Sequence, residues 1–335
     1  MNQSPDISVI VLTYNQQDTI ARTIDSILSQ QLPDGKSLEI VVSDDASTDS
    51  TRQIVEQMAA ERPDVVRLLP GAPNKGVVTN YFSTLAQCRG RYITDCSGDD
   101  FMTDPLRLAT QMELLDSDSD LIMVLTRFSK YEISTGTLIP SPLPKGHELT
   151  IINGAELLTP LLAHAPVNEI GPIHLSTALL RADSVKRALA KEGDMIFNPD
   201  FGCEDLPLLA ALFAGAGAAQ RDNNRVALLP RDTMAYSVMN PAQITASSPT
   251  PRAAIYYAST LRATAILARH YGVDFGSLYP YFRRVSAHAA RLALRSRSRR
   301  ATDILQSTLR EFPQIKVSPA TRLLVMTGHL LLSKD

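Results

Sequence analysis

Three pairs of adjacent acidic residues are the parts of this sequence best suited to chemistry: Asp44-Asp45, Asp99-Asp100 and Glu204-Asp205. Neighbouring carboxylates repel each other unless a positive charge lies near them. A Mg²⁺ ion bound to a diphosphate is a natural partner, because Mg²⁺ prefers one or two carboxylates together with phosphate oxygens. A carboxylate can also accept a hydrogen bond from the N–H of a uracil or thymine ring, or act as a general base. These are the components of an inverting group transfer from a nucleotide donor.

Each pair also has a structural explanation. Asp100 could cap a turn, with Asp99 solvated. Asp44-Asp45 precedes Ser47 and Thr48, either of which suits the N-terminal cap of the next helix. Glu204-Asp205 precedes an apolar helix, and acids near a helix N-terminus are favoured by its dipole. The chemical interpretation therefore depends on the three pairs being taken together.

The first hundred residues contain short apolar runs separated by amphipathic segments. Apolar runs without internal alternation indicate strands of a mainly parallel sheet with helices on both faces. Such sheets bind ligands at the carboxyl ends of their strands, where this chain has residues 13–15, 43–45 and 97–100. The predicted strands are Ile7–Tyr14, Glu39–Val42, Val65–Leu69 and Arg91–Cys96, and the helices are Gln17–Gln30, Asp49–Arg62 and Val78–Cys88.

The remainder of the chain predicts a second region. Leu121–Glu132 reads as a further strand, and the segment TGTLIPSPLPKG, residues 135–146, reads as a long loop over the site because it is rich in proline and glycine. We therefore expect an α/β catalytic domain over residues 1–238 and a helical extension over residues 239–335. The predicted helices are Ala155–Ala163, Ser184–Lys191, Leu206–Ala214, Arg252–Tyr271, Leu278–Arg300 and Ala301–Glu311.

Composition excludes several classes of protein. The chain has 335 residues, 44% of them hydrophobic, and a formal net charge of -2, so no overall charge favours nucleic acid. Its three cysteines are scattered without a CxxC pair, which favours reduced thiols over a disulfide framework. No signal peptide is predicted, and the longest apolar run, Arg322–Leu332, is broken by Gly328 and His329. We expect a cytoplasmic protein that can touch the inner face of the cell membrane.

The order of these motifs resembles family 2 glycosyltransferases with the GT-A fold, over about residues 5 to 238. The opening ISVIVLTYNQQDTIARTIDSILSQ is similar to that family's first strand and helix, and EIVVSDDASTDST to its nucleotide-binding turn. GRYITDCSGDDFMTDPLRLATQMELL resembles its metal-binding strand end. GPIHLSTALLRADSV and NPDFGCEDLPLLAALFAGAG resemble the acceptor-side stretch that contains the base.

The resemblance implies a role for each matching residue. Thr13, Tyr14 and Asn15 would line the nucleotide pocket, Asp44 or Asp45 would read the pyrimidine base, and Gly98 would adjoin the donor. Asp99 would ligate Mn²⁺ or Mg²⁺ on the diphosphate, with Asp100 nearby. Asp205 would be the general base, with Glu204 as its neighbour or as the alternative base. The implied reaction moves a sugar from a UDP- or dTDP-sugar to a glycan or lipid-linked acceptor in bacterial surface polysaccharide synthesis, such as O-antigen or capsule.

The chain departs from the family pattern at two places. Ser97 stands where the family often has an acid, and residues 236–239 read Tyr-Ser-Val-Met where a Tyr-Arg-x-His stretch is common. Arg231 or Asn240 could substitute in the phosphate-side contacts that this stretch makes in the family. A catalytically weakened relative that binds nucleotides or glycans is therefore the alternative. A nucleotidyltransferase is disfavoured, because residues 14–18 contain neither the glycine nor the basic residue that a triphosphate loop needs.

Two further features each have two explanations. His174 is either a packed structural residue or a neighbour of the acceptor. Arg284, His288, Arg291, Arg295 and Arg299 fall on one stripe of the predicted helix Leu278–Arg300, which is either a solvated face or a contact with anionic lipid. Nucleic acid is disfavoured because no aromatic residues interleave with the arginines. An all-helical extension also suits contacts between two subunits of a homodimer.

Overall fold

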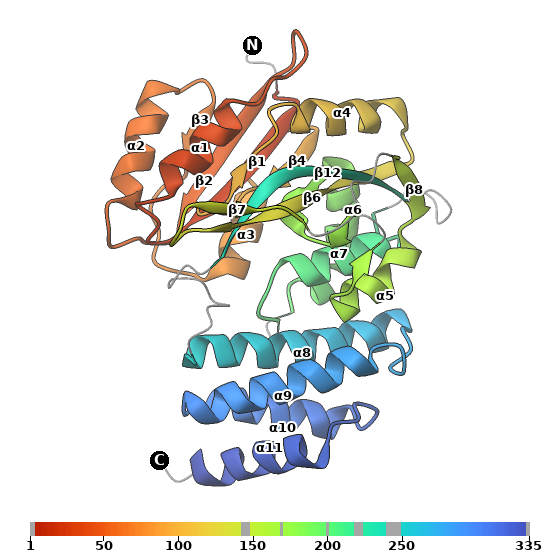
Figure 1. Cartoon of the computed structure of the whole chain (residues 1–335). Coiled ribbons are helices and arrows are strands. Elements are labelled where there is room, and N and C mark those ends of the chain that lie inside the picture. Colours follow the sequence, from red (N-terminus) through yellow and green to blue (C-terminus); the bar gives the residue numbers. More distant parts are fainter. Residues whose placement is uncertain are drawn as a thin grey trace.

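The computed structural model describes residues 4–141, 148–167, 170–198, 201–217, 224–238 and 249–332. These residues form an α/β part built on a ten-stranded mixed sheet, with a stack of helices beneath it (Figure 1). The strand order is β3-β2-β1-β4-β11-β6-β12-β5, with β7 paired to β6 and β8 paired to β12.

The N-terminal half of the sheet is parallel, as the sequence predicts. The strands β1 (Ile7–Thr13), β2 (Leu38–Asp44), β3 (Val66–Leu68) and β4 (Tyr92–Asp95) pair in the order β3-β2-β1-β4. Thr13 lies opposite Asp44 in the register of β1 and β2. The ends of β1, β2 and β4, with the loops that follow them, therefore present their polar residues at one edge of the sheet.

Helices cover both faces of the sheet, because alternate residues of each strand enter different hydrophobic clusters. In β1, Val9 packs with the helices on one face, and Ile10 packs with those on the other. The first face is covered by α1 (Ile20–Leu28), α2 (Thr51–Glu61) and α4 (Arg107–Ser117). The second is covered by α3 (Val77–Leu85), α5 (Ala155–Ala163), α6 (Ala182–Ile196) and α7 (Asp205–Phe213).

The C-terminal half of the sheet mixes strand directions. β11 (Ala178–Arg181) is antiparallel to both β4 and β6 (Leu121–Glu132), and β12 (Arg225–Val238) is parallel to β6. The short edge strands are β5 (Phe101–Met102), β7 (Thr137–Ile139) and β8 (Thr150–Asn153). A small hairpin of β9 (Pro166–Val167) and β10 (Gly171–Pro172) precedes the 3₁₀ turn Leu175–Thr177.

Two sequence-based expectations about this half need correction. The long strand β12 was not predicted, because Pro230-Arg231-Asp232 interrupts its apolar pattern, where the pairing with β6 also shifts register. The segment predicted as a loop over residues 135–146 contains β7, whose exposed residues pair with the end of β6. Residues 142–147 of that segment, which include His147, lie outside the described residues.

Beyond residue 248 the described chain is helical, as predicted. The helices α8 (Pro251–Tyr271), α9 (Tyr279–Arg295), α10 (Arg299–Glu311) and α11 (Pro319–Leu332) lie in successive layers below α5 and α7 (Figure 1). The predicted helix Leu278–Arg300 ends early, because Arg297 adopts a positive φ of 53° and Ser298 caps α10 by accepting a hydrogen bond from the N–H of Ala301. Arg299 therefore belongs to α10 and leaves the predicted stripe on α9.

One hydrophobic cluster runs from the sheet into these helices. It contains Leu162 of α5, Leu208 of α7, Leu261 of α8 and Phe282 of α9, all completely buried. Because this cluster crosses residue 238, the division of the chain into residues 1–238 and 239–335 stays a prediction.

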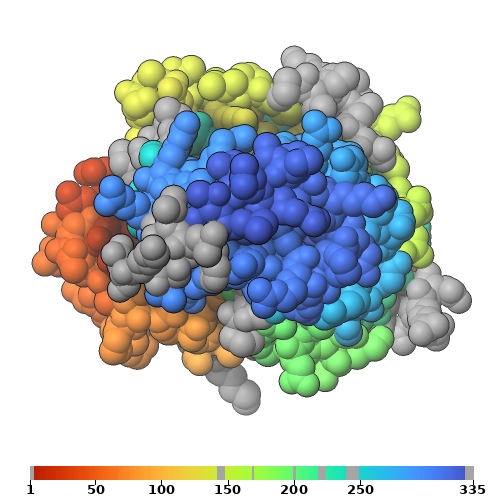
Figure 2. Space-filling model, turned by 90° about the horizontal axis from the view of Figure 1, so that it is seen from below, coloured from red at the N-terminus to blue at the C-terminus, as the bar shows by residue number. Residues whose placement is uncertain are grey.

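None of the helices within the described ranges is long and apolar enough to cross a membrane. The apolar run Arg322–Leu332 forms most of α11, which lies on the face seen from below (Figure 2). Leu323 and Met326 of this helix are exposed to 65% and 53%. The helix therefore presents apolar side chains on a surface that no other part of the described chain covers.

Candidate functional site

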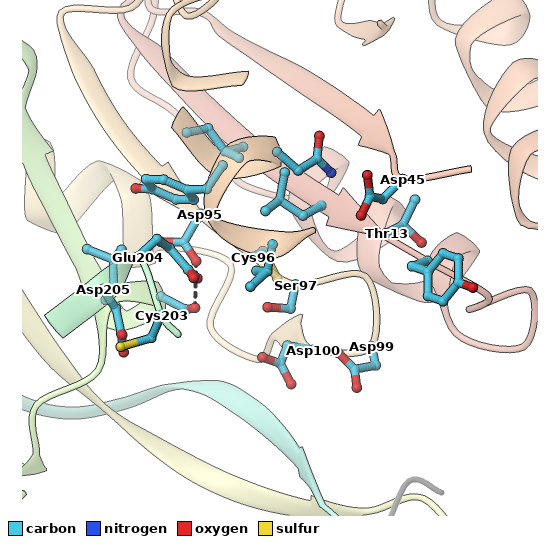
Figure 3. Close-up of a pocket in the computed structure, with 18 of the residues that line it drawn as sticks. Thr13, Asp45, Asp95, Cys96, Ser97, Asp99, Asp100, Cys203, Glu204 and Asp205 are labelled. Atoms are coloured by element: carbon cyan, nitrogen blue, oxygen red, sulfur yellow. Dashed lines mark hydrogen bonds between the residues drawn. The ribbon is translucent and has the colours of Figure 1, made fainter. Parts of the chain in front are cut away.

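A cavity of about 650 Å³ opens at the carboxyl ends of the parallel strands. Thr13, Asp45 and Asp99 lie at one end of this cavity, and Glu204 and Asp205 lie at the other (Figure 3). The three acidic clusters, which are far apart in the sequence, therefore contribute to one site. Seven of the predicted site residues line this cavity: Thr13, Tyr14, Asp45, Asp99, Asp100, Glu204 and Asp205.

Asp45 organises the end of the cavity nearest β1 and β2. Its carboxylate accepts hydrogen bonds from the backbone N–H groups of Lys75 at 2.9 Å and Gly76 at 3.0 Å. These bonds hold the start of α3 against the cavity, which Asn74 and Gly76 also line. Because an ionised carboxylate has about four acceptor positions, Asp45 retains positions for a ligand N–H.

Asn15 and Asp44 do not line the cavity. The Asn15 side chain accepts a hydrogen bond from the backbone N–H of Thr48 at 2.8 Å, and Asp44 accepts hydrogen bonds from the backbone and hydroxyl of Ser47. The expectation that Ser47 or Thr48 caps the next helix is wrong, because α2 begins only at Thr51. These contacts tie together the loops after β1 and β2, so Asp45 is the member of its pair that faces a ligand.

Gly98 holds the loop after β4 close to the end of β1. A Cβ atom at this position would lie 2.4 Å from Oε1 of Gln16 and 2.9 Å from Oγ1 of Thr13. The N–H of Gly98 also donates to the carbonyl of Leu12 at 2.9 Å. Gly98 is absent from the lining of the cavity, and the absence of its side chain lets the Asp99 loop approach Thr13.

Asp99 and Asp100 are 7% and 1% exposed. The backbone N–H of Ser237, on β12, donates to the Asp100 carboxylate at 2.8 Å, and the Ser237 hydroxyl bonds to the carbonyl of Asp99. Burial and then the adjacent Asp99 charge raise the pKa of Asp100 well above its usual range. A strand that was not predicted thus positions the predicted metal pair.

The donor set of this pair suits a hard divalent cation. Two carboxylates and the Ser97 side chain line the cavity here, and oxygen ligands are those that Mg²⁺ prefers. The described residues contain no cluster of three or more His, Cys, Asp or Glu side chains able to hold a metal by themselves. A cation at Asp99 and Asp100 would therefore complete its coordination with phosphate oxygens and water.

Glu204 and Asp205 lie at the N-terminus of α7, at the other end of the cavity. An Asp205 carboxylate oxygen accepts the N–H of Leu206 at 2.7 Å. Burial, followed by the charge of Asp205, raises the pKa of Glu204 to about 8. Glu204 is therefore largely protonated at neutral pH, and Asp205 is the better candidate for a base.

His174 packs against two aromatic rings and also lines the cavity. It is therefore both a packed residue and a residue of the site. Its ring lies 5.0 Å from the ring of Tyr236 and 5.5 Å from that of Phe128. Burial lowers the pKa of His174, against the opposing effect of the Asp205 charge. A neutral imidazole therefore stands on the same side of the cavity as the candidate base.

Several lining residues were not predicted from the sequence, among them Asp95, Tyr81, Arg252 and Tyr256. Asp95 could have been found, because it is a charged residue at the end of an apolar strand, two residues before Ser97. Arg252 and Tyr256 carry no such signal, since they reach the cavity only through the packing of α8 beneath α7. Arg231, suggested as a substitute cation, pairs with Asp104 at 2.6 Å and does not line the cavity; Asn240 lies outside the described residues.

Comparison with known proteins identifies the N-terminal part of the chain. Residues 8–169 match Glycosyl transferase family 2. The putative glycosyltransferase EpsE of Bacillus subtilis is 35% identical over 144 residues, covering 42% of this chain and 50% of EpsE. The Escherichia coli protein WfaP, a UDP-Glc:alpha-D-GlcNAc-diphosphoundecaprenol beta-1,3-glucosyltransferase, is 29% identical over 133 residues, covering 40% and 49%.

A solved structure resembles nearly the whole chain. Residues 1–349 of TarS from S. aureus, in complex with UDP-GlcNAc, match with a TM-score of 0.61 and 17% sequence identity, covering 98% of this chain and 90% of that one. This likeness confirms the predicted GT-A fold together with its C-terminal helices. The chain spans about half the length of the curated relatives EpsE and WfaP.

Proposed function

We propose that this chain, a member of glycosyltransferase family 2 with the GT-A fold, transfers a sugar from a nucleoside diphosphate sugar to an acceptor hydroxyl. The observation that carries the proposal is the order of the acidic side chains along one cavity. Asp45 and Asp99 lie at one end, Asp100 lies beside Asp99 on the side toward the middle, and Asp205 lies at the far end (Figure 3). A nucleotide, a diphosphate and a reacting sugar follow one another in the same order.

We assign the donor to the class of UDP- or dTDP-sugars. Asp45 retains acceptor positions for the ring N–H of uracil or thymine, and Thr13 and Tyr14 line the same end of the cavity. TarS was solved with UDP-GlcNAc, and WfaP uses UDP-Glc by its name, which supports this class of donor.

Asp99 and Asp100 would hold Mn²⁺ or Mg²⁺. When bound, the cation would stabilise the negative charge that develops on the departing diphosphate. The protein's own contribution is to fix the two carboxylates through Ser237 and to bring their loop against β1 through Gly98.

Asp205 would act as the general base. The acceptor oxygen attacks the anomeric carbon as the bond to the diphosphate breaks, and the hydroxyl proton passes to the Asp205 carboxylate. A single displacement of this kind inverts the configuration at the anomeric carbon. Protonated Glu204 would donate a hydrogen bond instead of competing for that proton, since its pKa is raised to about 8.

We further propose that the acceptor is a glycan or a lipid-linked glycan of a bacterial surface polysaccharide, and that the helical region touches an anionic membrane. WfaP, which acts on a diphosphoundecaprenol-linked sugar by its name, supports the acceptor class. Residues 249–332 carry thirteen lysines and arginines against three acidic residues, whereas the whole chain has 33 against 35. Arg284, Arg291 and Arg295 remain on one exposed side of α9.

Vesicle binding tests the membrane contact. We expect the chain to sediment with phosphatidylglycerol vesicles but not with phosphatidylcholine vesicles, and to be released by salt. The double variant R291E/R295E should lose this binding, whereas K186E/K191E, with the same charge change on exposed residues of α6, should keep it. Equal loss in both variants, or binding to neither vesicle, would contradict the proposal.

Ser97 and the sequence Tyr236-Ser237-Val238 favour one alternative, a catalytically weakened relative that binds nucleotide without turnover. Calorimetry with UDP, with and without Mn²⁺, combined with an assay for UDP release from a panel of UDP- and dTDP-sugars, separates the two. Binding with turnover supports the transferase. Tight binding without turnover on any donor supports the alternative, and failure to bind nucleotide overturns both.

A further inference from the structure

Asp95 lines the cavity but has no role in the proposed reaction. It ends β4, where it lies opposite Ile10 of β1. Its carboxylate lies beside Glu204, on the side of that residue that faces the proposed metal pair (Figure 3). In the proposed arrangement of the donor, this position would lie beside the transferred sugar and not beside the nucleotide.

A hydrogen bond from Ser176 fixes one oxygen of this carboxylate. The Ser176 hydroxyl donates to Oδ2 of Asp95 at 2.7 Å. Ser176 is itself held by the buried Arg107, whose Nη2 donates to the Ser176 carbonyl at 2.6 Å and to the Thr94 hydroxyl at 3.2 Å. A carboxylate fixed in this way has lost its rotational freedom before any ligand binds, which is the preorganisation that a binding site requires.

The same carboxylate is short of hydrogen-bond donors. Its Oδ1 is buried and has no hydrogen-bond partner within the described part of the chain. An ionised carboxylate offers about four acceptor positions, and Ser176 fills one of them. Buried polar groups without partners are rare and costly in proteins, so they point to a ligand or water that supplies the missing donor.

We propose that Asp95 binds a hydroxyl group of the transferred sugar and thereby determines which sugars the site accepts. This inference rests on the proposed function. Sugar hydroxyls are neutral donors, and a carboxylate accepts from them with a charge-assisted hydrogen bond. Tyr81 and Glu204, which line the cavity beside Asp95, complete a polar wall around the sugar.

Different residues are proposed for catalysis and for nucleotide binding, so the role of Asp95 can be measured separately. Asp205, at the start of α7, is the proposed base, and Asp45 lies at the opposite end of the cavity. A site that hydrogen-bonds a substrate hydroxyl strongly rejects the analogue that lacks it. Asp95 should therefore couple to one particular hydroxyl of the donor sugar.

The test measures that coupling in the full chain with Mn²⁺ present. Affinities of UDP, of the preferred UDP-hexose and of its 2-, 3-, 4- and 6-deoxy analogues are compared by calorimetric competition for the wild type, Asp95→Asn and Asp95→Ala. In the wild type, removing one hydroxyl should weaken binding roughly 10- to 100-fold, as expected for a hydrogen bond to a charged group. Asp95→Ala should bind the parent sugar that much more weakly and lose nothing further with that one analogue.

The controls separate this role from a structural one. Affinity for UDP itself should stay unchanged in both variants and in Asp183→Asn, an exposed control on α6. Equal weakening of UDP and UDP-hexose binding, or undiminished sensitivity to every deoxy analogue, would overturn the inference while leaving the proposed function intact. If the wild type binds no UDP, the proposed function fails instead. Asp95→Asn keeps the side-chain volume, so it provides the same comparison should Asp95→Ala not fold.

Discussion

The two acidic pairs at the ends of the cavity are nearly identical in sequence and are held by different elements. Asp99 and Asp100 follow a strand, and their loop is anchored by Ser237 of β12. Glu204 and Asp205 open the helix α7, where one carboxyl is held protonated by burial and by its neighbour's charge. The same two effects raise the pKa of Asp100, so the charge within each pair does not distinguish one pair from the other. The difference lies in position: the Asp99-Asp100 loop approaches Thr13 at the proposed nucleotide end, whereas Asp205 lies at the opposite end of the cavity. We therefore propose the first pair as the metal site and Asp205 as the base.

The largest effect expected from this difference is at Asp205. Asp205→Asn removes the proposed base and should lower kcat for sugar transfer by about 10²- to 10⁴-fold, the usual contribution of a general base. Affinity for UDP with Mn²⁺ should be unchanged, because the substitution is distant from the nucleotide end. Steady-state kinetics and calorimetry measure both quantities. Undiminished transfer in Asp205→Asn would show that the base lies elsewhere.

A smaller effect of a different kind is expected at the metal pair. Asp99→Asn should weaken the Mn²⁺-dependent part of UDP binding by at least about 10- to 100-fold. That is the loss of metal affinity when a residue that only hydrogen-bonds a metal ligand is replaced, and Asp99 is proposed as a ligand itself. UDP affinity measured in EDTA should be the same in the variant and the wild type. If Asp99→Asn lowers UDP affinity equally with and without Mn²⁺, the pair positions the nucleotide directly and holds no metal.

Protonation of Glu204, the neighbour of the proposed base, should make the stability of the fold depend on pH. The pKa of Glu204 rises from 4.5 to about 8 on folding, so the native state binds more protons than the unfolded state between these values. Stability should therefore fall as pH rises through this window. Glu204→Gln removes the effect, so its Tm relative to the wild type should increase from pH 5 to pH 8. A constant difference in Tm would mean that Glu204 is ionised throughout.

The smallest effect concerns Ser97, which stands near the metal pair in place of an acid. Ser97→Asp adds a third carboxylate beside Asp99 and Asp100, so Mn²⁺ affinity in the presence of UDP should rise by roughly two- to tenfold, about 0.4–1.4 kcal/mol. Without metal the same variant should have a lower Tm, because the added carboxylate lies close to the charge of Asp99 and is itself partly buried. Ser97→Asn, which adds no charge, is the matched control and should change neither quantity. An unchanged Mn²⁺ affinity in Ser97→Asp would mean that this position does not face the ion.

The sequence predicted the parallel half of the sheet better than the mixed half. Continuous apolar runs such as Ile7–Thr13 carry their own strand signal, whereas β12 is broken by Pro230 and by a shift of register. The acid pairs were found because each follows a strand or begins a helix. Asp95 was not predicted because it is a single acid, whereas the predicted sites were pairs, and Arg252 was not predicted because its position depends on how α8 packs.

The continuous hydrophobic cluster has a mechanical consequence. The helix that starts with Asp205 rests on α8, and α8 packs against α9, whose outer side carries the exposed arginines. A force applied to these arginines would therefore be passed through two layers of close-packed side chains to the start of α7, where Asp205 lies. If the proposed membrane contact anchors α9, it should therefore also restrict the motion of the cavity wall that carries Asp205.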